Sequence, residues 1–462
     1  MSFSIAELFS EHFDKKFELH EQHLNNQMVR VLRTIGYDRN YTKAVGQYLY
    51  DEDNTEYLDL LSGFGVFAVG RNHPTVIQAL QDTLSMELPN LIQMDVSLLS
   101  GLLAEKILAT VPDNLNKLFF CNSGTEAVEA AIKFARYTTK REHILHCEHS
   151  FHGLSLGALS LNGEDIFREG FGPLLPACSA IPFNDLEALE QALSNKDVAA
   201  FFVEPIQGKG VNVPDDNYLP EVERLCKKYG TLFVADEIQT GLGRTGEFWA
   251  IDHWQVKPDM ILMAKALSGG FIPIGAVAMT QNIMDTVFNR MDRAVVHGST
   301  FSKNNMAMAA GLATLQVMED EKLVENSARI GNDIINSIQA STHKYEFLKE
   351  ARGKGLMIAV EFQAPKSLKL KAAWAMLEAA NKGLFCQMVT IPLFKDHHML
   401  TQVAGHGMNV VKLLPPLNIT SKDRDWVVDS FDAAIAETHK IPGSIWDLGK
   451  NLASHAIKNK KK

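Results

Sequence analysis

The sequence is poor in cysteine and carries no paired-cysteine motif. Five cysteines are spread over 462 residues, at positions 121, 147, 178, 226 and 386, without a CxxC spacing. A disulfide framework or a structural zinc site would need closely spaced, even-numbered cysteines, so neither is expected. This cysteine usage favours a reducing, cytoplasmic location.

Long apolar runs and a secretory leader are also missing. No run approaches the roughly 18 apolar residues that a membrane-spanning helix requires. The opening MSFSIAELFSEHFDKK carries acidic residues early and lacks the basic stretch and apolar core of a signal peptide. We therefore expect no membrane insertion.

Positive charge is scarce, because the formal net charge is -10. Nucleic-acid binding needs clustered lysine and arginine to neutralise phosphates, so a nucleic-acid partner is not expected. The one basic run lies at 458–462, where four of five residues are lysine. A solvated terminus is the simplest interpretation of that run.

The chain does contain a regular alternation of short apolar runs with amphipathic stretches. The apolar runs lie at 117–121, 144–147, 200–203, 232–235, 260–263 and 276–279, with helical patterns between them that include 125–137 and 220–228. This alternation predicts an α/β fold with a mostly parallel central sheet and helices on both faces. Ligands of such sheets bind beyond the carboxyl ends of the strands.

After about residue 315 the pattern changes. Helical patterns at 305–319, 330–340 and 423–436 surround the apolar stretch RGKGLMIAVEF. The length is well above the roughly 100–200 residues of one domain. We predict a large domain over 61–315 and a smaller α+β domain over 316–462, which residues 1–60 are expected to join.

Ser123, Gly124 and Thr125 are the first candidate site residues. They follow an apolar run and open an alanine-rich helical pattern. A glycine turn that feeds a helix N-terminus exposes unpaired N–H groups and the positive end of the helix dipole, and the hydroxyls add donors. The pattern favours an anion cradle, with an ordinary Ser/Thr helix cap as the alternative.

Asp236 and Lys265 each follow an apolar run, TLFVA and MILMA. A buried carboxylate needs a cationic partner, such as a protonated pyridine nitrogen, and a partly desolvated lysine has the lowered pKa that Schiff-base chemistry requires. Each residue alone could be a turn acid or a snorkelling lysine. A phosphate cradle, a ring anchor and an aldehyde-binding amine at one sheet edge together fit pyridoxal phosphate (PLP).

Two other motifs compete with this interpretation. Residues 241–246 have the GxGxxG spacing of dinucleotide-binding turns, but EIQT separates them from the preceding run and no clean helical pattern follows. His146, His149 and His152 are three apart and could be metal ligands, but a continuing strand would point His146 and His149 to opposite faces. We therefore expect neither a dinucleotide nor a metal.

Over roughly residues 30–435 the sequence resembles the class III aminotransferases (ornithine, acetylornithine, γ-aminobutyrate and ω-amine) of PLP fold type I. The resemblance rests on NSGTEAVEAAIKFAR, SFHG, VEPIQG, VADEIQTGLGRTG, PDMILMAKALSGG and HGSTFSKN, in this order. It implies a PLP-dependent, ping-pong aminotransferase. In this mechanism Lys265 forms the Schiff base and, once freed, moves a proton between the substrate and the cofactor.

The resemblance also implies roles for individual residues. Besides the catalytic Lys265 and Asp236, the cofactor would be held by Ser123, Gly124 and Thr125 at the phosphate, Phe151 and Ile238 on the ring faces, Gln239 at the ring hydroxyl, and His152 and Glu204 in the pocket. Thr300 would complete the phosphate site of the neighbouring subunit. An obligate homodimer with shared active sites follows from that role.

Three positions depart from the amino-acid-specific members of this family. Leu154 stands where an arginine takes a distal carboxylate, and Lys209 lies in a shortened stretch that lacks the usual acid. Lys412 aligns with the arginine that takes the α-carboxylate, and lysine lacks the planar fork for bidentate binding. Phe64, with Phe67, adds apolar surface, either to a substrate channel or to plain core packing.

These departures predict that one substrate is a hydrophobic amine or aldehyde without a carboxylate near the reacting carbon. The aldehyde-aminating transaminases of bacterial alkaloid and pigment pathways are similar in this respect. An ornithine-, acetylornithine- or γ-aminobutyrate-type aminotransferase is the nearest alternative. A PLP aminomutase, decarboxylase or racemase, and a PLP-free protein without activity, are the others.

Overall fold

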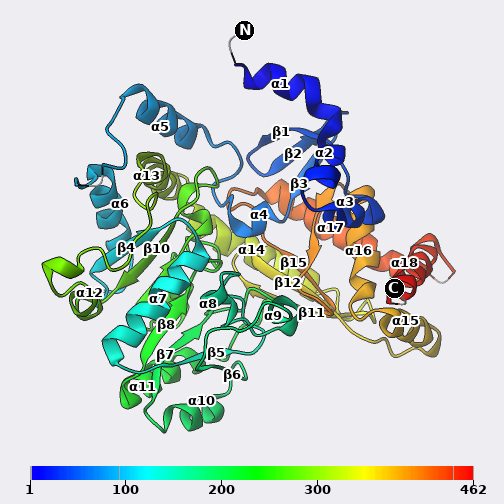
Figure 1. The fold of residues 1–462 in the computed structure, drawn as a ribbon. Coiled ribbons are helices and arrows are strands. Elements are labelled where there is room, and N and C mark those ends of the chain that lie inside the picture. Colours follow the sequence, from blue (N-terminus) through cyan, green and yellow to red (C-terminus); the bar gives the residue numbers. More distant parts are fainter. Residues whose placement is uncertain (1–2, 93, 441, 461–462) are drawn as a thin grey trace.

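The centre of the chain folds into a seven-stranded sheet (Figure 1). The structure, a computed structural model, describes residues 3–92, 94–440 and 442–460. In sheet order the strands are β4 (Lys117–Cys121), β10 (Gly275–Met279), β9 (Met260–Met263), β8 (Leu232–Asp236), β7 (Val198–Val203), β5 (His143–Cys147) and β6 (Cys178–Ile181). Among these strands only β10 is antiparallel to its neighbours, so the predicted mostly parallel sheet is confirmed.

Helices cover both faces of this sheet, as predicted. On one face α7 (Gly124–Thr139) and α12 (Gln281–Val287) pack on alternate strand residues such as Phe202, Val234 and Leu262. The intervening residues, such as Phe201 and Phe233, belong to a second core that includes α6 (Leu98–Leu108), α11 (Tyr218–Tyr229) and α13 (Asn305–Asp320). Because successive strand residues pack against different apolar layers, both kinds of position are apolar and each strand is a continuous apolar run in the sequence.

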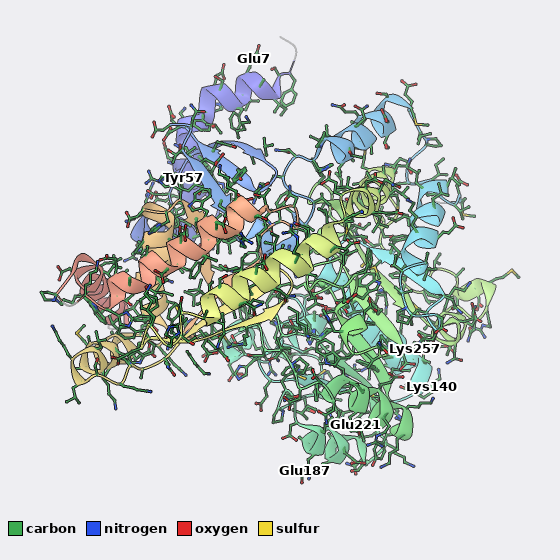
Figure 2. All side chains as sticks on the ribbon, turned by 180° about the vertical axis from the view of Figure 1, so that it is seen from behind. Glu7, Tyr57, Lys140, Glu187, Glu221 and Lys257 are labelled. Carbon is green, nitrogen blue, oxygen red and sulfur yellow. The ribbon has the colours of Figure 1, made fainter. Side chains whose placement is uncertain are left out.

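Two smaller four-stranded sheets flank the central one. One contains β1 (Tyr41–Val45), β2 (Tyr48–Asp51), β3 (Glu56–Asp59) and β13 (Met399–Leu400), and the other β11 (Leu348–Lys354), β12 (Met357–Phe362), β15 (Val410–Leu413) and β14 (Gln402–Val403). Because β3 pairs with β13, the first 60 residues are joined to the last quarter of the chain. Helices α14 (Leu323–Gln339) and α17 (Ser421–Thr438) lie side by side behind these sheets (Figure 2).

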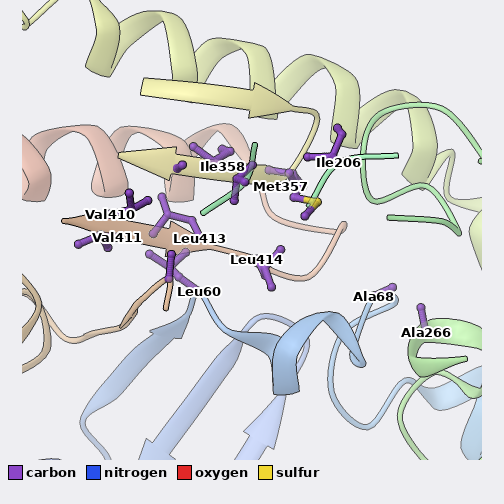
Figure 3. Packing of buried hydrophobic residues seen from close by; sticks show 14 of the residues in the cluster. Leu60, Ala68, Ile206, Ala266, Met357, Ile358, Val410, Val411, Leu413 and Leu414 are labelled. Atoms are coloured by element: carbon purple, nitrogen blue, oxygen red, sulfur yellow. The ribbon is translucent and has the colours of Figure 1, made fainter. Parts of the chain in front are cut away.

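The sheet of β11, β12, β15 and β14 is called the small sheet below. The apolar core runs without a break from this sheet into the central part of the molecule. Figure 3 shows Met357 and Leu413 of β12 and β15 packed with Leu60 from the N-terminal part and with Ile206, which follows β7. All four side chains are buried. This packing fixes β15 beside the segment that follows β7, and so determines where the side chain of Lys412 ends.

The remaining helices lie around these layers. They are α1 (Ile5–His12), α2 (Lys16–His23), α3 (Asn26–Ile35), α4 (Ser62–Gly65), α5 (Pro74–Ser85), α8 (Leu156–Leu159), α9 (Asp165–Arg168), α10 (Leu186–Leu193), α15 (Leu368–Ala380), α16 (Leu384–Lys395) and α18 (Ser444–Lys460), with short 3₁₀ turns at Phe13–Lys15, Ala250–His253, Lys265–Ser268 and Met291–Arg293. All five cysteines are free. No helix in the described ranges is both long and apolar enough to cross a membrane. Residues 461 and 462 of the basic run lie outside the described residues.

Candidate active site

The three groups singled out in the sequence meet at one edge of the central sheet. Strands β4, β8 and β9 run in the same direction, because β10 is antiparallel to both β4 and β9 and β8 is parallel to β9. Ser123, Asp236 and Lys265 follow or end these strands, so all three lie at the same edge. A cavity of about 410 Å³ opens there, and Ser123 and Lys265 line it.

The N-terminus of α7 forms one end of this cavity. Ser123 is its N-cap and accepts a hydrogen bond from the N–H of Glu126 at 3.3 Å. The Oγ1 of Thr125 lies 2.5 Å from the Oγ of Ser155. A Cβ at Gly124 would come within 2.9 Å of the Ile238 side chain, so glycine leaves room between that side chain and the helix. Free N–H groups at the start of a 16-residue helix suit an anion.

Asp236, buried at the end of β8, has two partners. The Nδ1 of His152 lies 2.6 Å from its Oδ2, and the N–H of Ile238 donates to its Oδ1 at 3.1 Å. Burial lowers the pKa of His152, but the hydrogen bond and charge of Asp236 outweigh burial, so the pKa is raised overall. His152 and Ile238 line the cavity, whereas Asp236 lies behind them and is not among its lining residues.

Lys265 lies in a short 3₁₀ turn just beyond β9, which ends at Met263. Its φ of 39° lies in the left-handed region that non-glycine residues rarely adopt. Burial lowers the pKa of the amine, while the charges of Asp236 and Glu204 partly oppose that shift. Burial therefore favours the neutral amine more than it would be favoured on an exposed lysine.

Glu204 is buried after β7 and holds two backbone segments. It accepts from the N–H of Phe151 at 3.0 Å and from the N–H of Gly208 at 2.7 Å. Burial and the charge of Asp236 raise the pKa of Glu204, against the charge of His152 and the two N–H donors. Glu204 thereby fixes the backbone of Phe151, whose ring lines the cavity together with Ile238.

Lys412 reaches this region from the small sheet. Its Nζ donates to the carbonyl of Gly208 at 2.7 Å and to the Oε1 of Gln239 at 3.4 Å. Gln239 in turn donates to the carbonyl of Phe64 at 3.2 Å. Lys209 turns away from Lys412 and pairs with Glu164 at 2.6 Å. Lys412, Gln239 and the backbone of Phe64 thus form one hydrogen-bonded group.

Phe64, Leu154 and Thr300 lie apart from the cavity. Of the other predicted residues, Lys209, Glu204, Gln239 and Lys412 do not line it either. The side chains of Phe64 and Leu154 are more than half exposed, and neither residue lines it. Thr300 lines a different cavity, of about 960 Å³, together with Leu91, Ile92, Val295 and Ser299. Within one chain, therefore, Thr300 does not contribute to the site around Lys265.

The competing motifs have other roles in the structure. Residues 241–246 lie in turns followed by a four-residue 3₁₀ turn, which is not the strand–turn–helix unit of a dinucleotide site. Arg244 in this segment is fully buried and donates to the carbonyls of Leu356 and Pro415. His146 lies near the carbonyl of Cys147, whereas His152 bonds Asp236. The described residues contain no cluster of metal-binding side chains.

Some site residues were not found from the sequence. Ser155 links Thr125 to Glu129, whose carboxylate accepts from the Ser155 hydroxyl at 2.6 Å. Asn162 accepts from the N–H of His152 at 2.9 Å. These are short polar side chains without distinctive spacing, and their partners are 10 to 30 positions away. The segment Phe271–Ile274 also lines the cavity and was not singled out from the sequence.

The residues present fit PLP. The start of α7 offers N–H groups and hydroxyls to a phosphate, Phe151 and Ile238 are apolar walls for a ring, and Lys265 offers an amine to an aldehyde. The Nε2 of His152 is buried without a hydrogen-bond partner in the described residues. A buried polar atom of this kind needs a ligand or a water molecule as its partner.

Sequence comparisons agree on one family. The class III aminotransferase profile matches residues 34–435. Acetylornithine aminotransferase from Bacillus cereus is 38% identical over 391 residues, which cover 84% of this chain and 92% of that protein. Aminotransferase PigE from a Serratia species is 34% identical over 444 residues, 89% of this chain and 52% of that protein. This chain thus spans about half the length of PigE.

Solved structures give the same result. The ornithine aminotransferase of Toxoplasma gondii ME49 is 28% identical, with a TM-score of 0.79, and the match covers 95% of this chain and 99% of that one. An amine transaminase from an uncultivated Pseudomonas species, in its PLP-bound form, is 28% identical, with a TM-score of 0.74 and coverage of 86% and 94%.

Proposed function

This chain belongs to the class III aminotransferases, which depend on PLP, and we propose that one of its substrates is a hydrophobic amine or aldehyde without a carboxylate near the reacting carbon. The other substrate is an amino acid or its keto acid. The proposal follows from two features of the site, the lysine at position 412 and the apolar lining of the cavity.

Lys412 is the observation that carries the proposal. It occupies the position at which the family resemblance leads one to expect an arginine, and both of its hydrogen-bond acceptors are uncharged oxygens. A guanidinium offers two parallel donors to a carboxylate, whereas an amine offers a single point of contact. A substrate carboxylate would therefore be bound less firmly here than by arginine.

The cavity wall supports the same substrate class. Val66, Phe271, Ile272 and Ile274 line it together with Phe151. Apolar walls favour an alkyl or aryl chain by roughly 25 cal/mol for each Å² removed from water. Leu154, exposed just outside the cavity, offers no charge to a distal carboxylate.

In the proposed mechanism Lys265 moves the proton. When bound, PLP supplies a ring that withdraws the electron pair left as a proton leaves the substrate carbon. The amine of Lys265, whose pKa burial lowers, takes that proton and returns it. Asp236, oriented by His152, would hold a proton at the pyridine nitrogen, and Gln239 would bond the ring hydroxyl.

The residues that would hold the cofactor are those implied by the resemblance. Ser123, Gly124 and Thr125 would bind the phosphate at the start of α7, and Phe151 and Ile238 would contact the two ring faces. Glu204 would keep Phe151 in place through its backbone N–H. We also propose that the chain divides into domains near residues 60 and 315. A cytoplasmic location is proposed as well.

We further propose a homodimer in which Thr300 completes the partner's phosphate site. In one chain Thr300 is exposed and lines a cavity other than the one that contains Lys265. Apolar side chains around it are unusually exposed, among them Val96 (85%), Met291 (97%) and Val295 (90%). An exposed apolar surface of this kind is typical of a protein interface.

A substrate panel tests the function. Holoenzyme would be offered linear alkylamines, ornithine, acetylornithine and γ-aminobutyrate with one keto acid, and keto-acid consumption would be followed. The proposal expects the alkylamines to have the highest kcat/KM. Efficient turnover of ornithine or acetylornithine without alkylamine activity would refute it, and product formation without keto-acid consumption would indicate a racemase or mutase.

A further inference from the structure

Lys412 is a buried lysine of the small sheet whose amine ends in the large domain. Its strand, β15, pairs with β12 and β14, where the facing residues are Ala359 and Gln402. The residue is 4% exposed. Its amine therefore depends on the groups around Gly208 and Gln239 for its hydrogen bonds.

These groups match a neutral amine better than an ammonium ion. An ammonium carries three N–H donors and a neutral amine carries two. Lys412 has two acceptors, the Gly208 carbonyl and the Gln239 Oε1, and no described carboxylate forms an ion pair with it. A third N–H would be buried without a partner, which costs free energy.

Burial and the neighbouring charges together also favour the neutral form of Lys412. Lys265 and Lys209 are the cations whose charges act on it, and Glu204 is the anion that does so. Glu204 already accepts from two backbone N–H groups and Lys209 is already paired with Glu164. Burial, followed by the charge of Lys265, lowers the pKa of Lys412 to about 7, against the charge of Glu204.

We propose that Lys412 is an uncharged hydrogen-bond donor in the resting enzyme and takes up a proton when a substrate carboxylate enters. Protonation of this one lysine then lets the same site accept both a carboxylate-bearing and a carboxylate-free substrate. This inference rests on the proposed function, because it explains how both substrates of the transfer share one site. The proton comes from solvent, and no covalent bond changes in the step.

The structure provides a way for a carboxylate to reach the amine. The contact with Gln239 is 3.4 Å long, near the limit of a hydrogen bond, so it is the weaker of the two. Gln239 and Phe64 are both partly open to solvent. A carboxylate oxygen that replaces the Gln239 oxygen would keep the bond to Gly208 and gain a charged partner.

Binding and protonation are linked, so each strengthens the other. Because a bound carboxylate would raise the pKa of Lys412 from about 7, carboxylate affinity should be full below that pH. Above it, affinity should fall about tenfold per pH unit, since a proton must be taken up on binding. Affinity for an alkylamine should not fall with pH for this reason.

The test uses hexanoate, a carboxylate without an amino group, bound to holoenzyme between pH 6 and 9. Wild-type enzyme should show the tenfold loss per unit above pH 7. Lys412→Arg, which stays charged, should bind hexanoate with little dependence on pH and lose at least about tenfold in kcat/KM for hexylamine. Lys412→Met should bind hexanoate weakly at every pH, without the tenfold loss per unit above pH 7.

Calorimetry in two buffers of different ionisation enthalpy supplies a second measurement. At pH 8 the wild type should take up about one more proton per hexanoate than Lys412→Arg. The exposed Lys43→Met, in β1, is the matched control and should behave like the wild type. Cofactor absorbance and circular dichroism would show that each variant is folded and loaded, and Lys412→Gln would replace any variant that is not.

The inference is overturned if Lys412→Arg keeps the wild-type pH dependence, or if proton uptake is equal in the two proteins. That failure is separate from failure of the proposed function. Hexanoate binding does not depend on which amine is the substrate, so an enzyme that turns over only ornithine could still show the proton uptake.

Discussion

The two sides of the active-site cavity balance their buried charges in opposite ways. On the large-domain side Asp236 lies 2.6 Å from His152, and Glu204 accepts from two backbone N–H groups. On the side reached from the small sheet, Lys412 donates to a carbonyl and an amide oxygen and forms no ion pair with a carboxylate of the described residues. Asp236 and Glu204 thus have partners within the protein, whereas Lys412 has no ion-pair partner among the described residues.

This difference fits what each side has to bind. A cofactor that stays bound has fixed charges, so fixed partners can be folded around it. Substrates that alternate between carrying and lacking a carboxylate cannot be matched by one fixed charge, because an unpaired buried ion is costly. We therefore expect substitutions on the cofactor side to cost more activity than those on the substrate side.

Lys265→Ala should have the largest effect. Removal of the amine that is proposed to move the proton should lower multiple turnover by at least about 10⁴-fold, while leaving the fold intact. Steady-state kinetics measures the loss, and circular dichroism with a thermal melt provides the control. Turnover that survives with alanine at this position would show that another group moves the proton.

Asp236→Ala should rank second. Removal of one partner of a buried charge pair costs about 3–5 kcal/mol, which corresponds to roughly 10²- to 10⁴-fold in rate if it is lost in the transition state. Asp236→Asn keeps the shape and removes the charge, so it should be nearly as slow. A near-normal rate for either variant would mean that the acid only orients His152.

His152→Ala should have an intermediate effect. Loss of a hydrogen bond to a charged group costs about 1.5–3 kcal/mol, or roughly 10- to 100-fold in cofactor affinity and kcat together. His152→Asn can still donate to Asp236 and should recover part of the loss. The measurement is a PLP titration followed by absorbance, and an equal loss in both variants would indicate a packing role instead.

Leu154→Arg should have the smallest effect and should act on the substrate side. A new cation outside the cavity should raise kcat/KM for donors with a distal carboxylate by a few-fold, in keeping with an exposed ion pair of about 0.2–1 kcal/mol. Leu156→Arg, equally exposed two residues further on, is the matched control. Equal gains in the two variants would reveal only general electrostatic attraction.

The sequence predicted where Asp236 and Lys265 lie in the sheet, because both residues end or follow buried strands. Six apolar runs predicted six strands of the central sheet, and their ends placed Asp236 and Lys265 at one edge. Strand β6 was missed, because Cys178–Ile181 lies at the sheet edge, is only partly buried and contains a serine. An edge strand with one neighbour has little apolar signal.

The contacts between distant segments could not be predicted. His152 and Asp236 are 84 positions apart and Lys412 and Gly208 are 204 apart. Whether Lys209 faces Lys412 or Glu164 depends on side-chain geometry, which residue spacing does not determine. The sequence thus identified which residues are unusual, and the fold determined which of them meet.

Arg244 lies in the turn segment that follows β8, and it connects the central sheet to the small sheet. Its guanidinium binds the carbonyl of Leu356, in the turn between β11 and β12, and that of Pro415, just after β15. The β11–β12 turn and the end of β15 are therefore both tied to the segment that follows Asp236. Melting of the small sheet should release PLP in the same cooperative event, and a calorimetric scan of holoenzyme should show a single transition.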